Sequence, residues 1–346
     1  MRLDEMGIRA FAYAMAQRYL QRSDRSIVSN ALLYDWQKPT AQSTRETSPV
    51  PPVATGTYLA KDDSRLRELE EAYARVEGPV TTPTVWTADH IRAIDLQRFR
   101  ADDAYLWQHR GRDMNEMSFV LAYYYLKTMD RLRLFDRLDE DRAFGVNLFE
   151  VVEGRLVTRD LLDSVAELNF LERHLAISQR ATLVVLDVGA GYGRLAYRSL
   201  TALPAIQRYL CTDAVPVSTF ICEHYLRYRG VDARAQVVPL HEVRSTLRQY
   251  PVDLAINIHS FSECRVEAIA WWMALLREHG VRHLMVVPNV VGTDGVTMFT
   301  TDGEDFSRVL TDHGYRLLAR DPKYLDPLVQ KYGPTPAVHF LFELRP

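Results

Sequence analysis

The sequence predicts an α/β fold in which a mainly helical N-terminal region precedes a mostly parallel sheet of seven strands. From residue 182 onward, short apolar runs alternate with amphipathic segments, which is typical of a parallel sheet covered on both faces. Before about residue 135, apolar residues recur at three- and four-residue spacing with little glycine or proline, which is typical of helices. We therefore expect a helical region over 1–150 and an α/β domain over 151–346.

Composition supports a folded globular chain. The 346 residues are 47% apolar and 25% charged, which disfavours wholesale disorder and a coiled-coil rod, and the length suits two units better than one. The 42 Lys and Arg residues against 45 Asp and Glu residues give a net charge of −3. Without an excess of basic side chains, a nucleic acid is not the expected partner.

The three cysteines are Cys211, Cys222 and Cys264, and their isolated spacing suits neither a zinc site nor a disulfide framework. No run of 18 apolar residues occurs, and the first residues lack the basic and then apolar layout of a secretory signal. These features predict a cytoplasmic protein that does not contact a membrane. No compact carboxylate cluster calls for a metal ion.

The N-terminal region is expected to hold helices at 8–20, 63–76, 87–100 and 115–134. Residues 37–57 are rich in Pro, Ser and Thr and carry too little apolar surface to order themselves, so they predict a mobile loop. This loop is either a surface connection or a lid over a site. The region as a whole is expected to bind an acceptor, to cover a site, or to form an oligomer contact.

The second half begins with an extended pair at 149–152 and 155–157, and Thr158 is expected to cap a helix that runs to about residue 175. The expected strands are 183–186, 207–212, 235–238, 253–256, 283–287, 315–319 and 338–344. The expected helices are 194–203, 216–229, 265–279 and 302–313, with one more short helix within 241–251. Because 320–337 holds no long helix, the last two strands are expected to be antiparallel neighbours.

A glycine-rich loop follows the first of these strands, in the stretch LVVLDVGAGYGRLA (183–196). The strand leads into Gly189, Ala190, Gly191 and Gly193 and then directly into a helix. Glycines let the backbone approach a bound molecule closely, and the start of a helix offers unpaired N–H groups. The pattern therefore predicts a ligand loop at the carboxyl end of a strand.

The residues around this loop favour an adenosyl ligand. A dinucleotide motif needs a small residue where this chain has Arg194, and no nucleoside triphosphate loop is present. Asp187 would repel a pyrophosphate but suits an ammonium or a sulfonium group. Asp213, followed by Ala214 at the next strand end, can accept hydrogen bonds from ribose hydroxyls. Its alternative role is to cap the helix that begins near Pro216.

Asp187, the three glycines, Asp213 and the final antiparallel pair together resemble the class I S-adenosylmethionine-dependent methyltransferases over residues 180–346. The segments VTRDLLDS (157–164), GAGYGRLA (189–196), TDAVPVSTF (212–220) and INIHSFSE (256–263) resemble bacterial sugar O-methyltransferases. The resemblance implies a Rossmann-like sheet, S-adenosylmethionine as cofactor, and methyl transfer to a hydroxyl of a sugar or a glycosylated natural product. His259 departs from the pattern, because an acidic or small residue is expected there in that group.

An alcohol acceptor must lose its proton, and the carboxyl end of the fourth strand is the expected place for the base. His259 has an ordinary pKa of about 6.5 and can accept a proton at neutral pH. Glu263 can orient it or act itself, so both are predicted to be catalytic. In their alternative roles, His259 bonds a loop carbonyl and Glu263 caps the following helix.

Other residues are assigned by their position in the layout. Asn257 is expected to line the methionine end of the cofactor, Leu240 to contact adenine, and His241 to be either a polar neighbour of the base or a surface residue. The stretch from Trp107 to Glu116 carries side chains suited to sugar hydroxyls or phosphate, unless it is only a solvated loop.

Other functions stay open at this point. The expected partner is a sugar or glycoside, and the chain can also form a homo-oligomer. The alternatives are a methyltransferase for a non-sugar metabolite, directed to nitrogen or carboxyl, a non-catalytic S-adenosylmethionine-binding subunit, and a nicotinamide dehydrogenase.

Overall fold

The computed structural model describes residues 59–81, 84–101, 105, 116–141, 143–146, 148–151, 154–289 and 296–345, with 11–13, 15–16, 18–20 and 22 near the N-terminus. The predicted loop at 37–57 and residues 107–115 lie outside the described residues.

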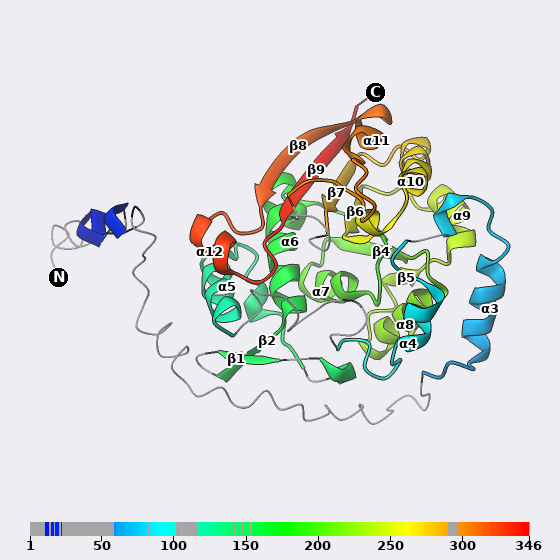
Figure 1. Ribbon diagram of the computed structural model, residues 1–346, viewed down its shortest axis with the longest axis horizontal. Helices are drawn as coiled ribbons and strands as arrows, with labels where there is room; N and C mark the ends of the chain where they lie inside the picture. Colours follow the sequence, from blue (N-terminus) through cyan, green and yellow to red (C-terminus); the bar gives the residue numbers. More distant parts are fainter. Residues whose placement is uncertain are drawn as a thin grey trace.

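Seven strands form one sheet in the order β5-β4-β3-β6-β7-β9-β8 (Figure 1). Their bounds are β3 Leu183–Val188, β4 Ile206–Thr212, β5 Ala235–Val237, β6 Leu254–Ile258, β7 His283–Val287, β8 Tyr315–Pro322 and β9 Val338–Leu344. Within this sheet β9 runs antiparallel to both neighbours, β7 and β8, and the other pairings are parallel. The predicted α/β, Rossmann-like sheet with an antiparallel last strand is therefore confirmed.

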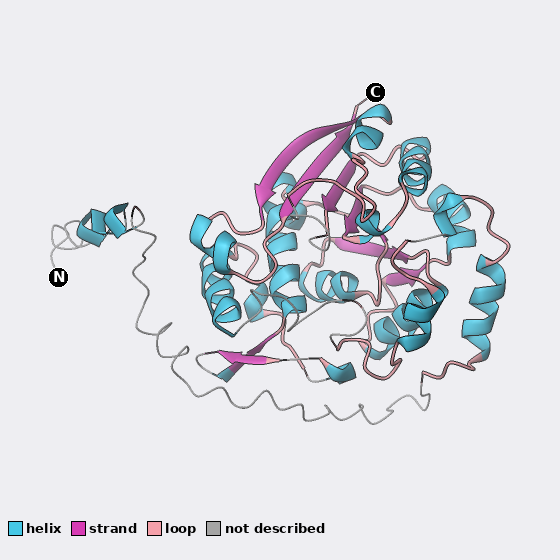
Figure 2. Cartoon of the chain, viewed as in Figure 1, coloured by secondary structure: helices cyan, strands magenta, loops and turns pink. Residues whose placement is uncertain are grey.

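Helices cover both faces of the sheet (Figure 2). Their bounds are α6 Arg159–Leu175, α7 Arg194–Ala202, α8 Pro216–Tyr228, α9 Val243–Gln249, α10 Val266–Glu278, α11 Ser307–Asp312 and α12 Pro327–Tyr332. The strand order reverses at β3, where the chain returns from β5 to β6. Because parallel crossovers are right-handed, this reversal puts α7 and α8 on one face and α9 and α10 on the other.

Local signals explain most element ends. Thr158 caps α6 as predicted, since its side chain accepts a hydrogen bond from the N–H of Leu161 at 3.0 Å. The predicted helix 302–313 is wrong at its start. Phe299 pairs with Asp305 across a turn in which Gly303 has a φ of 84°, so α11 begins only at Ser307.

The N-terminal region contributes α3 Ser64–Tyr73, α4 Ala88–Ala93 and α5 Glu116–Met129, followed by the antiparallel pair β1 Phe149–Val151 and β2 Arg155–Val157. The α3 helix packs against α8, where Arg65 pairs with Glu223 at 2.6 Å. The α5 helix packs against α6 and α12. Buried side chains of this region join the same apolar core as the sheet. Among the described helices, none combines the length and apolar composition that a membrane crossing requires.

Candidate functional site

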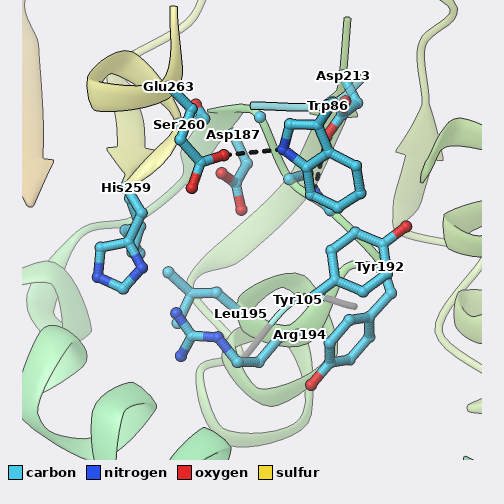
Figure 3. A pocket seen from close by; sticks show the side chains of 14 residues that line it. Trp86, Tyr105, Asp187, Tyr192, Arg194, Leu195, Asp213, His259, Ser260 and Glu263 are labelled. Atoms are coloured by element: carbon cyan, nitrogen blue, oxygen red, sulfur yellow. Dashed lines mark hydrogen bonds between the residues drawn. The ribbon is translucent and has the colours of Figure 1, made fainter. Parts of the chain in front are cut away.

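A pocket of about 90 Å³ lies at the carboxyl ends of β3, β4 and β6 (Figure 3). Its walls are Trp86, Tyr105, Asp187, Gly189, Ala190, Gly191, Tyr192, Arg194, Leu195, Asp213, Ile258, His259, Ser260 and Glu263. Strand β3 lies between β4 and β6, so this is the point where the strand order reverses. Open α/β sheets bind ligands at such points.

The glycine loop forms one wall. Gly189 and Gly191 have φ angles of 78° and 56°, which disfavour residues with a Cβ atom. A Cβ on Gly189 would lie 2.0 Å from the Oγ atom of Ser260, and a Cβ on Gly191 would lie 3.1 Å from the ring of Tyr105. Gly193 lies behind the loop against Cys222 and begins α7. Ser260 and Tyr105 therefore lie so close to the loop backbone that Gly189 and Gly191 leave little room for a side chain.

Asp187 and Asp213 both line the pocket. Asp187 accepts a hydrogen bond from the hydroxyl of Tyr209 at 3.0 Å, and burial raises its pKa to about 7. The carboxylate of Asp213 accepts from the backbone N–H groups of Gly191 at 3.0 Å and Val215 at 2.9 Å. Burial still raises the pKa of Asp213 to about 7, and the nearby Glu263 adds to the rise. Asp213 thus joins the glycine loop to the turn before α8.

His259 directly follows β6 in a strained conformation, with φ 68° and ψ −34°. Its N–H donates to the carbonyl of Val287 at 2.7 Å, which holds the turn, and the imidazole lines the pocket. Burial lowers the pKa of His259 to about 3, and the guanidinium of Arg159 contributes to this shift. The side chain is therefore neutral at pH 7.

Asn257 supports the wall from behind. Its side-chain nitrogen donates to the carbonyl of Val188 at 2.8 Å and to the Oγ of Ser260 at 2.6 Å, and its oxygen accepts from the N–H of Phe261 at 3.0 Å. Asn257 is fully buried and does not line the pocket. It positions Ser260 against Gly189.

Glu263 makes its hydrogen bonds away from His259. Its carboxylate accepts from the indole N–H of Trp86 at 2.8 Å and from the side-chain amide of Asn289 at 2.7 Å. Burial raises its pKa, although these two hydrogen bonds oppose the rise. The N-cap position of α10 is occupied by Arg265, without a side-chain cap. Glu263 therefore links the N-terminal region to the end of β6.

Leu240 and His241, assigned above to the adenine, do not line this pocket. The N–H of Leu240 donates to the hydroxyl of Tyr73 at 3.0 Å. The ring of His241 packs edge-on against that of Tyr73, with 6.2 Å between the ring centroids. Ala214 lines a smaller adjoining cavity. The described ranges contain no group of three His, Cys, Asp or Glu side chains arranged to hold a metal ion.

Helix α6, which carries most of the segment VTRDLLDS, supports the loop from below. Glu167 accepts two hydrogen bonds from the guanidinium of Arg194 at 2.8 and 2.9 Å, and Ser164 accepts a third at 2.8 Å. Asp160 accepts a hydrogen bond from the hydroxyl of Tyr192. Two side chains of the glycine loop are thus held by buried polar partners on α6.

Sequence reasoning missed two aromatic walls, Trp86 and Tyr105. Their rings lie 5.2 Å apart, and the hydroxyl of Tyr105 donates to Ser218 at 3.1 Å. Both come from the N-terminal region and reach the pocket only through tertiary contacts. Tyr192 and Arg194, by contrast, stand within the glycine-loop motif, so the sequence offered a signal for them.

No protein-family model matches the chain, and no curated protein matches it. Among solved structures, it is similar to a SAM dependent methyltransferase from Aquifex aeolicus, with 15% identity, 50% of this chain and 89% of that chain covered, and a TM-score of 0.37. The [4+2]-cyclase SpnF shows 17% identity, coverage of 66% and 96%, and a TM-score of 0.38. The mitomycin 7-O-methyltransferase MmcR shows 14% identity, coverage of 53% and 57%, and a TM-score of 0.36. Similarity of this extent identifies neither a substrate nor a reaction for this chain.

Proposed function

We propose that the protein is an S-adenosylmethionine-dependent O-methyltransferase acting on a hydroxyl of a small molecule, with a sugar or glycoside as the first candidate. The observation that carries this is the set of three carboxyls around the glycine loop, Asp187, Asp213 and Glu263, of which none forms an ion pair in the part of the chain that the structure describes. Enclosed carboxyls without a basic partner favour a cationic ligand. A pyrophosphate-bearing dinucleotide would be repelled.

The carboxyls of the pocket suit two parts of this cofactor, its ribose and its cationic groups. Asp213, which directly follows β4, is the proposed acceptor of hydrogen bonds from the ribose hydroxyls. Asp187 lies in β3 beside the glycine loop, and a bound ammonium or sulfonium group would favour its ionised form. When bound, S-adenosylmethionine supplies a methyl group that is already activated. The protein therefore has to orient the acceptor, exclude water and take up a proton.

His259 is the proposed proton acceptor. Its imidazole is neutral at pH 7, it lines the pocket, and its strained backbone is held by Val287. Strain of this kind persists where the surrounding structure requires it and is frequent at active sites. Glu263, whose oxygens bond Trp86 and Asn289, stays a proposed catalytic residue only through its position at the same edge.

The lowered pKa of His259, about 3, favours a second candidate function. A base this weak removes the proton of an acidic group more readily than that of an alcohol. An acceptor with an acidic hydroxyl, a carboxylate or a nitrogen would therefore place less demand on His259. This would be a methyltransferase of a non-sugar metabolite.

Two measurements test these proposals. Calorimetric titration with S-adenosylhomocysteine should give saturable binding. Methyl-labelled S-adenosylmethionine should then transfer label to one class in a panel of nucleotide sugars, glycosides, phenols and amines, with and without a chelator. For an alcohol acceptor His259→Ala should lower kcat roughly 100-fold or more. Binding without transfer to any acceptor would instead indicate a non-catalytic subunit, and absence of binding would refute the proposed cofactor.

A further inference from the structure

Trp86 stands at the boundary between the pocket and a smaller cavity of about 30 Å³. The two cavities share four wall residues, namely Trp86, Gly189, Ser260 and Glu263. The smaller cavity is completed by Val188, Ala214, Phe261, Cys264 and Trp272. These added residues are apolar or weakly polar, whereas the larger pocket holds Asp187, Asp213 and His259.

The two cavities suit the two ends of one ligand. Asp213 lines the larger pocket, and the next residue, Ala214, lines the smaller one. A nucleoside whose ribose bonds Asp213 would place its base on the apolar side and its charged amino-acid part near Asp187. Resting on the proposed function, we infer that Trp86 covers the adenine ring of the bound cofactor and that Glu263 positions its indole.

Glu263 holds the Trp86 segment at several points. The indole N–H donates to its carboxylate at 2.8 Å, and the main-chain carbonyl of Glu263 accepts from both the N–H and the Oγ of Thr84 at 2.9 Å. Asn289 donates to the other carboxylate oxygen at 2.7 Å and fixes its orientation. The indole is therefore held by polar contacts at its N–H edge (Figure 3). The centroid of its ring also lies 5.1 Å from that of His90 and 5.2 Å from that of Tyr105.

Trp86 is the more exposed of the two tryptophans that line the smaller cavity. A cavity of about 30 Å³ holds only a water-sized group, so an adenine ring enters only when a side chain of the wall shifts. Trp272 is only 3% exposed and packs within α10, whereas Trp86 is partly exposed on a surface segment. Binding should therefore change the surroundings of the Trp86 indole.

The test is a titration of the full-length protein with S-adenosylhomocysteine, followed by tryptophan fluorescence and by calorimetry. The chain has five tryptophans, so the difference between wild type and Trp86→Phe isolates the Trp86 signal. Trp86→Ala should weaken binding roughly 5- to 100-fold, the range of base stacking on an aromatic side chain. Trp271→Phe, on the same helix as Trp272 but outside both cavities, is the matched control and should bind as wild type.

A ligand that lacks adenine distinguishes the loss of the contact between Trp86 and adenine from general damage to the fold. The affinity for S-ribosylhomocysteine should be unchanged in Trp86→Ala. The affinity for S-adenosylhomocysteine relative to that for S-ribosylhomocysteine should therefore fall in that variant. Glu263→Ala should shift the Trp86 emission spectrum before any ligand is added. If wild type binds S-adenosylhomocysteine but Trp86→Ala binds it equally well, the role of Trp86 is refuted and the proposed function stands. If wild type does not bind it, both are refuted.

Discussion

Two sets of enclosed carboxyls among the described residues differ in their partners. Around α6, Glu140 accepts hydrogen bonds from Arg100 at 2.6 Å and Arg198 at 2.7 Å. Burial works to raise the pKa of Glu140, but the two guanidinium groups outweigh it and hold the pKa at about 2. At the pocket, neither Asp187 nor Asp213 forms an ion pair with a described residue, and burial raises the pKa of each to about 7, although the charge of Arg194 opposes the rise at Asp187.

This difference distinguishes carboxylates that stabilise the fold from carboxyls that can favour a bound ligand. A buried carboxylate with guanidinium partners is satisfied within the protein, and its neighbours depend on it. A carboxyl enclosed without a cation is left with a free-energy cost that a bound cation can offset. The α6 network thus holds the glycine loop in place, and the pocket carboxyls give the loop its preference for a positive ligand.

The largest expected effect comes from breaking the satisfied network. Glu140→Gln removes one negative charge and leaves the fully buried Arg100 and Arg198 side chains with less compensation. The free energy of unfolding at pH 7 should fall by about 3 to 5 kcal/mol, as it does when one partner of a buried ion pair is lost. Urea denaturation monitored by circular dichroism measures this.

The control for Glu140→Gln is the same change at the exposed pair of Glu71 and Arg75, whose charged groups lie 3.7 Å apart. Glu71→Gln should alter the unfolding free energy by less than about 1 kcal/mol. If both variants lost the same free energy of unfolding, the buried ion pairs would contribute no more to stability than the exposed pair.

A smaller effect of opposite sign is expected at the pocket. Asp187→Asn makes the same chemical change at a carboxyl that has no cation partner, and an asparagine oxygen can still accept from Tyr209. At pH 8 the free energy of unfolding should rise by roughly 1 to 3 kcal/mol, because the cost of ionising a buried group is removed. The same variant should bind S-adenosylmethionine roughly 10- to 100-fold more weakly. A loss of stability would contradict the contrast between the two sets.

The sequence was enough to predict the part of the site that is local in the chain. Strand β3, its glycines and the start of α7 follow one another within 14 residues, so spacing alone identified the loop and Asp187. Asp213 was found because the carboxyl ends of neighbouring parallel strands meet at one edge. The alternation of apolar runs with helices predicted a mostly parallel sheet of seven strands, but it did not predict the order of the strands in the sheet.

The missed parts depend on contacts between distant residues. Trp86 and Glu263 are 177 positions apart, and no local sequence pattern at either residue predicts the hydrogen bond between them. The start of α11 was misplaced because the turn at Gly303 competes with the helix, and helical spacing does not report such a turn. The buried ion pairs around α6 were not predicted, since charged residues give no sign of burial in a sequence.

The smallest expected effect is a pH dependence of cofactor binding. Asp187 and Asp213 have an ordinary pKa of 3.8 and a folded-state pKa of about 7, so the unliganded protein loses stability as the pH rises from about 4 to 7. A cationic ligand favours the ionised carboxyls, so its binding should release protons. The affinity for S-adenosylmethionine should therefore rise about 3- to 10-fold from pH 6 to pH 7.5, a range in which its amino group stays mostly charged. His259, with a pKa of about 3, does not titrate in this range.

Calorimetry in two buffers of different ionisation enthalpy measures both the affinity and the number of protons released. S-adenosylhomocysteine, which lacks the sulfonium charge, should show a shallower rise, and Asp187→Asn should flatten the rise for both ligands. An affinity that is constant or falls over the same range would mean that the carboxyls of the pocket are already ionised before the ligand binds. The two sets of carboxyls would then be alike in charge, and the preference for a positive ligand would have to come from shape rather than from unpaired acid groups.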